Sequence, residues 1–286
     1  MTILQTERKM SSDNQSPILS QDDLDFWEKN GYVVAKKAVS EQNATRAAQV
    51  IWDFLEMDPK NPETWYPDPP RPSIMVEIYQ NQALWDNRQA FRVHQAFSQV
   101  WNNEKLWVSF DRGSMNPPNR NPEAKQFGLH WDTNVDKRPI SFGVQGVLYL
   151  TDTAENQGAF QCVPGFHNTI EDWLDSLPEG EDPRRQDLHA LGSKCIPAEI
   201  GDLIIWRTAL PHGASLNTSD KPRIVQYITM NPANDSNEDA CQSRINWWQE
   251  RLTGLGRNTK ENEHHYGKTA DLSPLGRKLL GMDKWN

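Results

Sequence analysis

The chain has 286 residues, of which 36% are hydrophobic, and a formal net charge of −9. This acidic balance, without a cluster of Lys and Arg, argues against a nucleic-acid partner, because binding to phosphates requires concentrated positive charge. No stretch approaches the ~20 consecutive apolar residues that cross a bilayer, and the N-terminus shows no charged-then-apolar targeting pattern. We therefore expect a cytoplasmic protein that does not enter a membrane, with three widely spaced cysteines that stay reduced.

The first third of the chain predicts a mobile tail followed by helices. Residues 1–19 are polar and rich in Ser, Gln and Asn, so we expect them to be disordered. Residues 57–72 contain six prolines, which exclude regular structure and predict a surface loop or a lid. The regular elements expected here are a helix from Ser20 to Gly31, a strand at 32–34, and helices at 41–56 and 81–102.

From Leu106 onward the pattern changes to short apolar runs bounded by Gly, Pro, Asn and Asp, which is typical of an antiparallel barrel or sandwich. The strands expected are 106–111, 127–131, 142–151, 158–163, 202–207, 211–215 and 223–230. We also expect a helical stretch at 168–190, a helix at 240–252 and a loosely structured end. Residues 20–286 are predicted to form one domain.

A possible metal-binding motif lies in the segment Leu129-His130-Trp131-Asp132. On an extended strand, side chains two positions apart project to the same side, so the imidazole of His130 and the carboxylate of Asp132 could reach one ion. A second histidine would complete the facial triad of two histidines and one carboxylate, which leaves positions open on iron(II). His212 is the candidate, because a predicted strand delivers it and Gly213 leaves space beside it.

Arg223 follows His212 by eleven residues, past the turn-forming segment 217–222. If that segment closes a hairpin, Arg223 lies about 7 to 10 Å along the partner strand from the point opposite His212. A five-carbon keto diacid fits this gap. Its keto-acid end would chelate the metal, and its distal carboxylate would form a charge-assisted pair with the guanidinium.

These residues stand in a sequence that resembles the phytanoyl-CoA dioxygenase family of iron(II) and 2-oxoglutarate oxygenases. The resemblance runs from about Ser20 to Pro232, and the order of its blocks is more specific than any single one. The blocks are Asn30 to Val34, Gly128 to Asp132, Glu155 to Phe160 with Val163 to His167, and Gly201 to Met230.

The resemblance implies a mostly β fold with flanking helices, built on a double-stranded β-helix (a cupin-like jelly roll). It also implies iron(II) held by His130, Asp132 and His212, 2-oxoglutarate held by Arg223, and O2 as co-reactant. The products would be succinate, CO2 and a small organic molecule hydroxylated at an unactivated C–H bond. Because related halogenases carry Gly or Ala at the carboxylate position, Asp132 favours hydroxylation, desaturation or another oxidative rearrangement.

Other cosubstrate and substrate residues are predicted with less support. Family members often carry a hydroxyl residue two places after the distal histidine, where this chain has Ala214, so Ser215 is the substitute. The resemblance adds Arg112, Ser114 and Asn116, from the segment before the metal motif, to the cosubstrate pocket. Possible substrate contacts are Trp206, Trp65 and Arg71, although ordinary core and loop roles for them stay open.

Simpler roles compete with each of these assignments. His130 and Asp132 could form a surface hydrogen bond, His212 could be an ordinary buried histidine, and Arg223 could pair with Asp202 or Asp220. The remaining histidines, including His167, His94, His189 and the pair His264-His265, are expected to be structural. At the level of function, the rivals are a cupin-type isomerase or hydrolase and a non-catalytic binding module. The primary substrate and the oligomeric state stay open.

Overall fold

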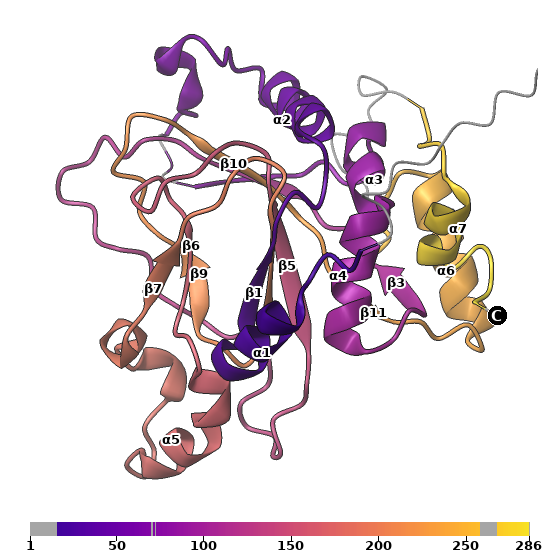
Figure 1. Ribbon diagram of the computed structural model, residues 1–286. Coiled ribbons are helices and arrows are strands. Elements are labelled where there is room, and N and C mark those ends of the chain that lie inside the picture. The colour runs from indigo at the N-terminus through magenta and orange to yellow at the C-terminus, as the bar shows by residue number, and fades with distance from the viewer. Residues whose placement is uncertain (1–15, 70, 72, 258–267, 286) are drawn as a thin grey trace, which may run out of the picture.

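The structure, a computed structural model, describes residues 16–69, 71, 73–257 and 268–285. Its centre is a pair of antiparallel sheets with a hydrophobic cluster between them (Figure 1). The larger sheet has the strand order β1-β8-β5-β10-β4-β2. Its strands are β1 (Tyr32–Ala35), β2 (Ile74–Val76), β4 (Gly113–Asn116), β5 (Val144–Tyr149), β8 (Leu203–Arg207) and β10 (Arg223–Tyr227).

The smaller sheet has the order β7-β6-β9, and its three strands are β6 (Phe160–Cys162), β7 (Lys194–Ile196) and β9 (His212–Ala214). A separate pair is formed by β3 (Leu106–Val108) and β11 (Met230–Pro232). All the pairings between these strands are antiparallel. The expected double-stranded β-helix is therefore the core of the protein.

The alternation of side chains along each strand separates two hydrophobic cores. In β8, Leu203 and Ile205 face the cluster on the outer side of the large sheet, which includes side chains of the N-terminal helices. Ile204 and Trp206 face the interior of the roll, where they meet residues of the small sheet such as Phe160. Because both faces of β8 are covered, the strand is apolar throughout rather than alternating.

Helices cover the outer face of the large sheet, on the side away from β6, β7 and β9 (Figure 1). They include α2 (Glu41–Leu55), α3 (Gln82–Arg88) and α4 (Phe91–Trp101), with α1 (Gln21–Asn30), α5 (Ile170–Ser176), α6 (Glu238–Gln249) and α7 (Pro274–Leu280) at the periphery. Helix α1 begins with a capping box between Ser20 and Asp23 and ends at Gly31, whose φ of 74° suits glycine. No described helix is long and apolar enough to cross a bilayer.

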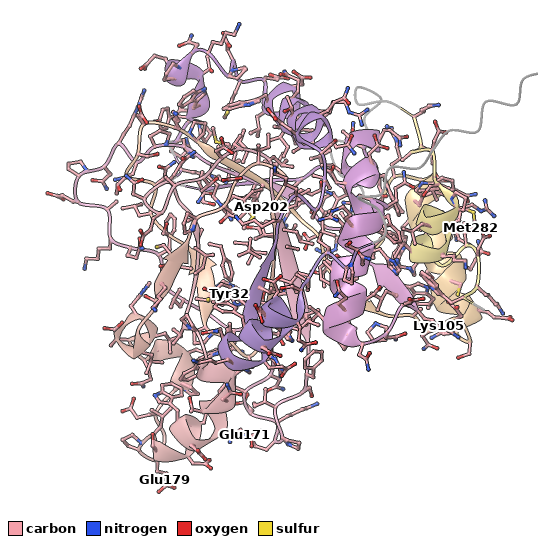
Figure 2. The ribbon with its side chains drawn as sticks, in the orientation of Figure 1. Tyr32, Lys105, Glu171, Glu179, Asp202 and Met282 are labelled. Atoms are coloured by element: carbon pink, nitrogen blue, oxygen red, sulfur yellow. The ribbon has the colours of Figure 1, made fainter. Side chains whose placement is uncertain are left out.

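Asp202 fixes the start of β8 against the end of β1, and Tyr32 begins β1 at the opposite end of the pair (Figure 2). The Asp202 carboxylate is fully buried and forms an ion pair of 2.7 Å with the ammonium group of Lys36. It also accepts the backbone N–H groups of Lys37 and Glu199, each at 3.0 Å. These three bonds occupy Asp202, so it is not the partner of Arg223.

Several predicted elements are confirmed, and others differ in extent. The helices expected at 20–31, 41–56 and 240–252 are present with small shifts of their ends. The helix expected at 81–102 divides at Gln89 and Ala90 into α3 and α4. The strand expected at 127–131 is reduced to one bridge from His130 to His212. The stretch 168–190 forms only α5 and short 3-10 turns.

The prediction of a loosely structured C-terminal end is wrong for residues 268–285. Helix α7 lies there, starting after the N-cap Ser273 and ending before Gly281, and its Leu279 and Leu280 are fully buried. The tail predicted for residues 1–19 falls mostly outside the described residues. Leu19 nevertheless lies in the core and exchanges two backbone hydrogen bonds with the Gln99 side chain, so the ordered chain begins before Ser20.

Candidate active site

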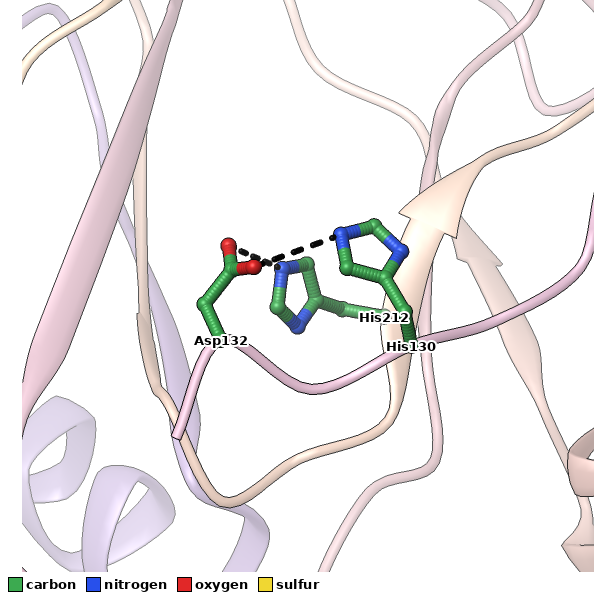
Figure 3. A group of neighbouring side chains, drawn as sticks. All are labelled: His130, Asp132 and His212. Atoms are coloured by element: carbon green, nitrogen blue, oxygen red, sulfur yellow. Dashed lines mark ion pairs between the residues drawn. The ribbon is translucent and has the colours of Figure 1, made fainter. Parts of the chain in front are cut away.

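His130, Asp132 and His212 come together at one point, where His212 is buried and the other two residues are exposed (Figure 3). Their candidate ligand atoms all lie within 4.8 Å of one another. Nε2 of His130 is 3.8 Å from Asp132 Oδ1, and Nε2 of His212 is 3.5 Å from Asp132 Oδ2. Two imidazole nitrogens and a carboxylate at this spacing can bind a single cation.

Backbone pairing positions the two histidines. The N–H of His130 donates to the carbonyl of His212 at 3.0 Å, and the reciprocal bond is 2.9 Å. The ring nitrogen Nδ1 of His212 lies 2.9 Å from the Leu210 carbonyl, which can only accept, so Nδ1 carries the proton. When the ring is neutral, Nε2 of His212 can therefore offer its lone pair to a metal ion, on the side that faces Asp132.

Asp132 is held by a residue of the large sheet. The side-chain amide of Gln145, on β5, donates to Asp132 Oδ2 at 2.8 Å. The His212 imidazole and this hydrogen bond hold the pKa of the Asp132 carboxyl well below its usual range, although burial opposes them. Burial and the neighbouring His212 lower the pKa of His130. Both shifts favour the deprotonated forms that bind metals.

The three residues open onto a pocket of about 420 Å³ between the sheets. The walls near the triad are apolar and aromatic, with Phe160, Trp206 and Val147 among them. Trp206 lies with its ring centroid 5.1 Å from that of His212. The other lining residues are Ser73, Met75, Asp111, Arg112, Phe127, Gly128, Gln145, Gly146, Gly213, Ala214, Arg223, Tyr227 and Thr229.

Arg223 contributes a buried cation to this pocket. It begins β10, and the residue is only 2% exposed. Its Nε and Nη1 atoms are buried without a hydrogen-bond partner, and no ion pair within the described chain involves it. The guanidinium lies 5.5 Å from the centre of the Tyr149 ring, whose own pKa is raised by burial. An ionised guanidinium in this position requires an anionic partner.

The hairpin expected between His212 and Arg223 is wrong. His212 lies on β9, which pairs with β6 in the small sheet, whereas Arg223 lies on β10, which pairs with β4 and β5 in the large sheet. The segment 217–222 crosses between the sheets, and Asn217 stabilises it by donating to the carbonyls of Asn116 and Lys221. Both residues still line one pocket, from opposite walls.

The remaining predicted cosubstrate residues fall into two groups. Arg112 lines the pocket, whereas Ser114, Asn116 and Ser215 are buried just outside the set of residues that line it. Asn116 is the direct cross-strand neighbour of Arg223, and its Oδ1 accepts from Ser114 at 3.2 Å. Ser114 and Asn116, on β4, therefore support the strand that carries Arg223, whereas the backbone N–H of Ser215 donates to the Ala159 carbonyl at 2.8 Å.

Of the three predicted substrate residues, one lines the pocket and two do not. Trp206 lines the pocket and its ring N–H has no partner among the described residues. Trp65 does not line it: its ring packs on Trp52 in the outer core, and its N–H donates to the Asp58 carbonyl at 2.9 Å. Arg71 is exposed and is not a lining residue. Trp65 is therefore a core residue of the proline-rich segment, packed on Trp52 of helix α2.

The other described histidines have structural partners. His167, His94 and His189 each place Nε2 within 3.0 Å of a backbone carbonyl, from Glu28, Glu104 and Phe127 respectively. None of them belongs to the metal-ligand cluster found among the described residues. His264 and His265 lie outside the described residues.

Sequence reasoning missed Gln145, the residue that orients Asp132. The signal was present: Gln145 is a polar residue inside a strand that is otherwise apolar, and it shares a face with Val147 and Tyr149. Its carbonyl oxygen is buried with no partner in the described structure. The pocket residues Met75 and Phe127 gave no comparable signal, because an apolar residue in a short segment is equally typical of a core position.

Comparisons with known proteins agree with this geometry. The sequence profile of the family described as phytanoyl-CoA dioxygenase matches residues 27–225. A Dictyostelium discoideum protein whose name assigns it to the phytanoyl-CoA dioxygenases is 24% identical, over 91% of this chain and 86% of its own length. "Ava biosynthesis cluster protein O" of Aspergillus versicolor is also 24% identical, over 77% of this chain and 80% of its own.

Solved structures share the fold at low sequence identity. A hypothetical protein of Escherichia coli, JW0805, superposes with a TM-score of 0.72 at 19% identity, covering 95% of this chain and 84% of that one. HygX of Streptomyces hygroscopicus, solved with nickel, 2-oxoglutarate and hygromycin B, gives a TM-score of 0.53 at 15% identity over 75% and 88% of the two chains. Because the family profile spans most of the chain, this protein belongs to the phytanoyl-CoA dioxygenase family of iron(II)- and 2-oxoglutarate-dependent oxygenases.

Proposed function

We propose that His130, Asp132 and His212 bind iron(II), that Arg223 binds the distal carboxylate of 2-oxoglutarate, and that the protein hydroxylates a C–H bond of a small organic molecule. One observation carries the proposal. A cluster of three ligand atoms within 4.8 Å and a buried guanidinium without an anionic partner line the same pocket.

The donor set fits iron(II). Two neutral imidazoles and one carboxylate form the facial triad used by non-haem iron oxygenases, in which one side of the metal is left open. In this chain His130 and His212 form a β-bridge, and Asp132 follows His130 by two residues. The pocket lies beside all three. His130 and His212 are held by backbone bonds and Asp132 by Gln145, so the site needs little rearrangement to bind the ion.

The fit to 2-oxoglutarate depends on Arg223. A guanidinium that is almost fully buried pairs favourably with a carboxylate that enters the same dry environment, and the pair adds charge-assisted hydrogen bonds. The unpartnered Nε and Nη1 atoms supply the donors. The pocket connects this residue with the triad, so the cosubstrate could occupy both ends at once.

When bound, iron and 2-oxoglutarate supply an oxidation by O2 that releases succinate and CO2. The protein's own contribution is to orient the ligands, bind the substrate beside them and exclude water. The aromatic walls formed by Trp206 and Phe160 serve the last purpose. A pocket of about 420 Å³ is within the usual range for small-molecule ligands.

Hydroxylation is favoured because Asp132 fills the ligand position that halogenases of related type leave open for chloride. A small-molecule substrate is also consistent with structural neighbours. HygX was solved with hygromycin B bound, and the epimerase SnoN was solved in complex with nogalamycin RO.

An anaerobic titration tests the proposal. Addition of iron(II) and 2-oxoglutarate to the metal-free protein should produce the visible metal-to-ligand charge-transfer band that iron(II) gives when 2-oxoglutarate chelates it. Zinc in place of iron should give no band and serves as the control for the protein and the cosubstrate. If iron loads fully and no band appears, the proposed cosubstrate is wrong and a cupin-type isomerase or hydrolase becomes the better assignment.

A further inference from the structure

Arg112 is a second cation of the pocket, and the proposed function leaves it unused. It precedes β4, and its carbonyl accepts the backbone N–H of Tyr227 at 2.9 Å. The same strand pair sets Asn116 opposite Arg223. Tyr227 lies four residues beyond Arg223, so the backbone at Arg112 is about 13 Å from the backbone at Arg223 along β10.

This register separates the two arginines. The distal carboxylate of 2-oxoglutarate, once paired with Arg223 and linked to the triad, has no need of a cation four residues further along β10. The residues that line the pocket around Arg112 include Met75, Tyr227 and Thr229, none of which we assign to metal or cosubstrate. Arg112 therefore lies in the part of the pocket left for the primary substrate, and its predicted role in binding the cosubstrate is not supported by the register.

The guanidinium of Arg112 has no anionic partner in the described structure. It is half-buried, its Nε atom is shielded from solvent without a hydrogen-bond partner, and none of the ion pairs found involves it. The neighbouring Asp111 also lines the pocket, but its carboxylate accepts the backbone N–H of Arg112 at 2.8 Å. Tyr79 forms a hydrogen bond with the Arg112 side chain, but it is a phenol and not an anion.

We propose that Arg112 binds a carboxylate of the primary substrate, so that the enzyme acts on small organic acids. The inference rests on the proposed function of the triad and Arg223. A buried or half-buried arginine that lines a ligand pocket without an anionic partner is best satisfied by an anion of the ligand. A carboxylate matches the fork of the guanidinium and the small volume of the pocket.

The test uses the whole protein with iron(II) and saturating 2-oxoglutarate under anaerobic conditions. The probes are aliphatic and aromatic monocarboxylic acids, each compared with its own primary amide. Binding is read from the shift of the charge-transfer band. Saturating 2-oxoglutarate keeps the acids away from Arg223. Because a hydrogen bond to a charged group is worth more than one to a neutral group, the wild type should bind at least one acid about tenfold more tightly than its amide.

Substitutions then test whether Arg112 causes the preference for acids over amides. In Arg112→Gln the ratio of acid to amide affinity should fall to about one. The matched control is Arg120→Gln, which removes an exposed guanidinium stacked on Tyr66 and outside the pocket, and which should keep the wild-type ratio. The wild-type comparison stands even if Arg112→Gln fails to fold.

The outcomes are distinct. A wild type with a normal charge-transfer band but no acid that binds more tightly than its amide would overturn the role of Arg112 and leave the proposed function intact. An unchanged preference in Arg112→Gln would do the same. Failure of the wild type to give the band at all would contradict the proposed function itself, and the inference about the substrate with it.

Discussion

The three triad residues and the two arginines of the pocket differ in how their polar groups are satisfied. At the triad, Nδ1 of His212 is bonded to Leu210, Asp132 is bonded to Gln145, and the backbones of His130 and His212 bond to each other. Along β10 and the segment before β4, the guanidinium groups of Arg223 and Arg112 keep buried nitrogen atoms without partners in the described structure.

This difference separates groups that the protein orients from groups that a ligand must satisfy. Hydrogen bonds from the surrounding chain fix the tautomer and direction of a metal ligand before the metal arrives. A buried donor left without a partner is unfavourable in the free protein, and its presence in a pocket indicates a partner that comes from outside. The side chains of the triad are thus held in place by the protein, and we propose that the two arginines bind anionic groups of the ligands.

The largest loss of iron(II) affinity is expected from a substitution of Asp132. Asp132→Ala removes the only carboxylate of the triad and leaves two imidazoles, so iron(II) affinity should fall by well over about a hundredfold, beyond the usual effect of losing an outer hydrogen bond. The measurement is the iron content after dialysis against a range of free iron(II) concentrations. Asp136→Ala, which alters an exposed carboxylate in the same loop, is the control. Equal iron affinity in both variants would show that Asp132 is not a ligand.

A smaller effect is expected at Gln145, the residue that orients Asp132. Gln145→Met keeps the approximate volume and removes the 2.8 Å hydrogen bond to Asp132, so iron(II) affinity should fall by about 10- to 100-fold. Gln49→Met removes another Gln-to-Asp hydrogen bond of 2.8 Å, on the exposed face of α2, and should leave iron affinity unchanged. If Gln145→Met also leaves it unchanged, the prearrangement of the triad does not depend on this bond.

Much of the site could be predicted from the sequence because its residues lie in short, ordered motifs. His130, Asp132 and Arg223 are identified by spacing and by resemblance to a family, and the structure brings them to one pocket with His212. The path between His212 and Arg223 could not be predicted. A segment such as 217–222, rich in Asn, Ser, Asp and Pro, closes hairpins and crosses between sheets equally well.

The missed elements have different causes. Strands β2 and β7 have three residues each, too few for a periodic pattern to show. The separation of Arg112 from Arg223 required the strand register, which depends on contacts distant in sequence. Helix α7, in contrast, carries signals that could have been used: Ser273 before Pro274 at the start, and Gly281 at the end.

The most direct test of the central claim compares two keto acids on Arg223→Ala. The wild type, loaded with iron(II) under anaerobic conditions, should bind 2-oxoglutarate more than about a hundredfold more tightly than 2-oxopentanoate, which lacks the distal carboxylate. In Arg223→Ala the two affinities should become nearly equal, because the charge that distinguishes the two acids is gone. A variant that still prefers 2-oxoglutarate as strongly as the wild type would contradict the account.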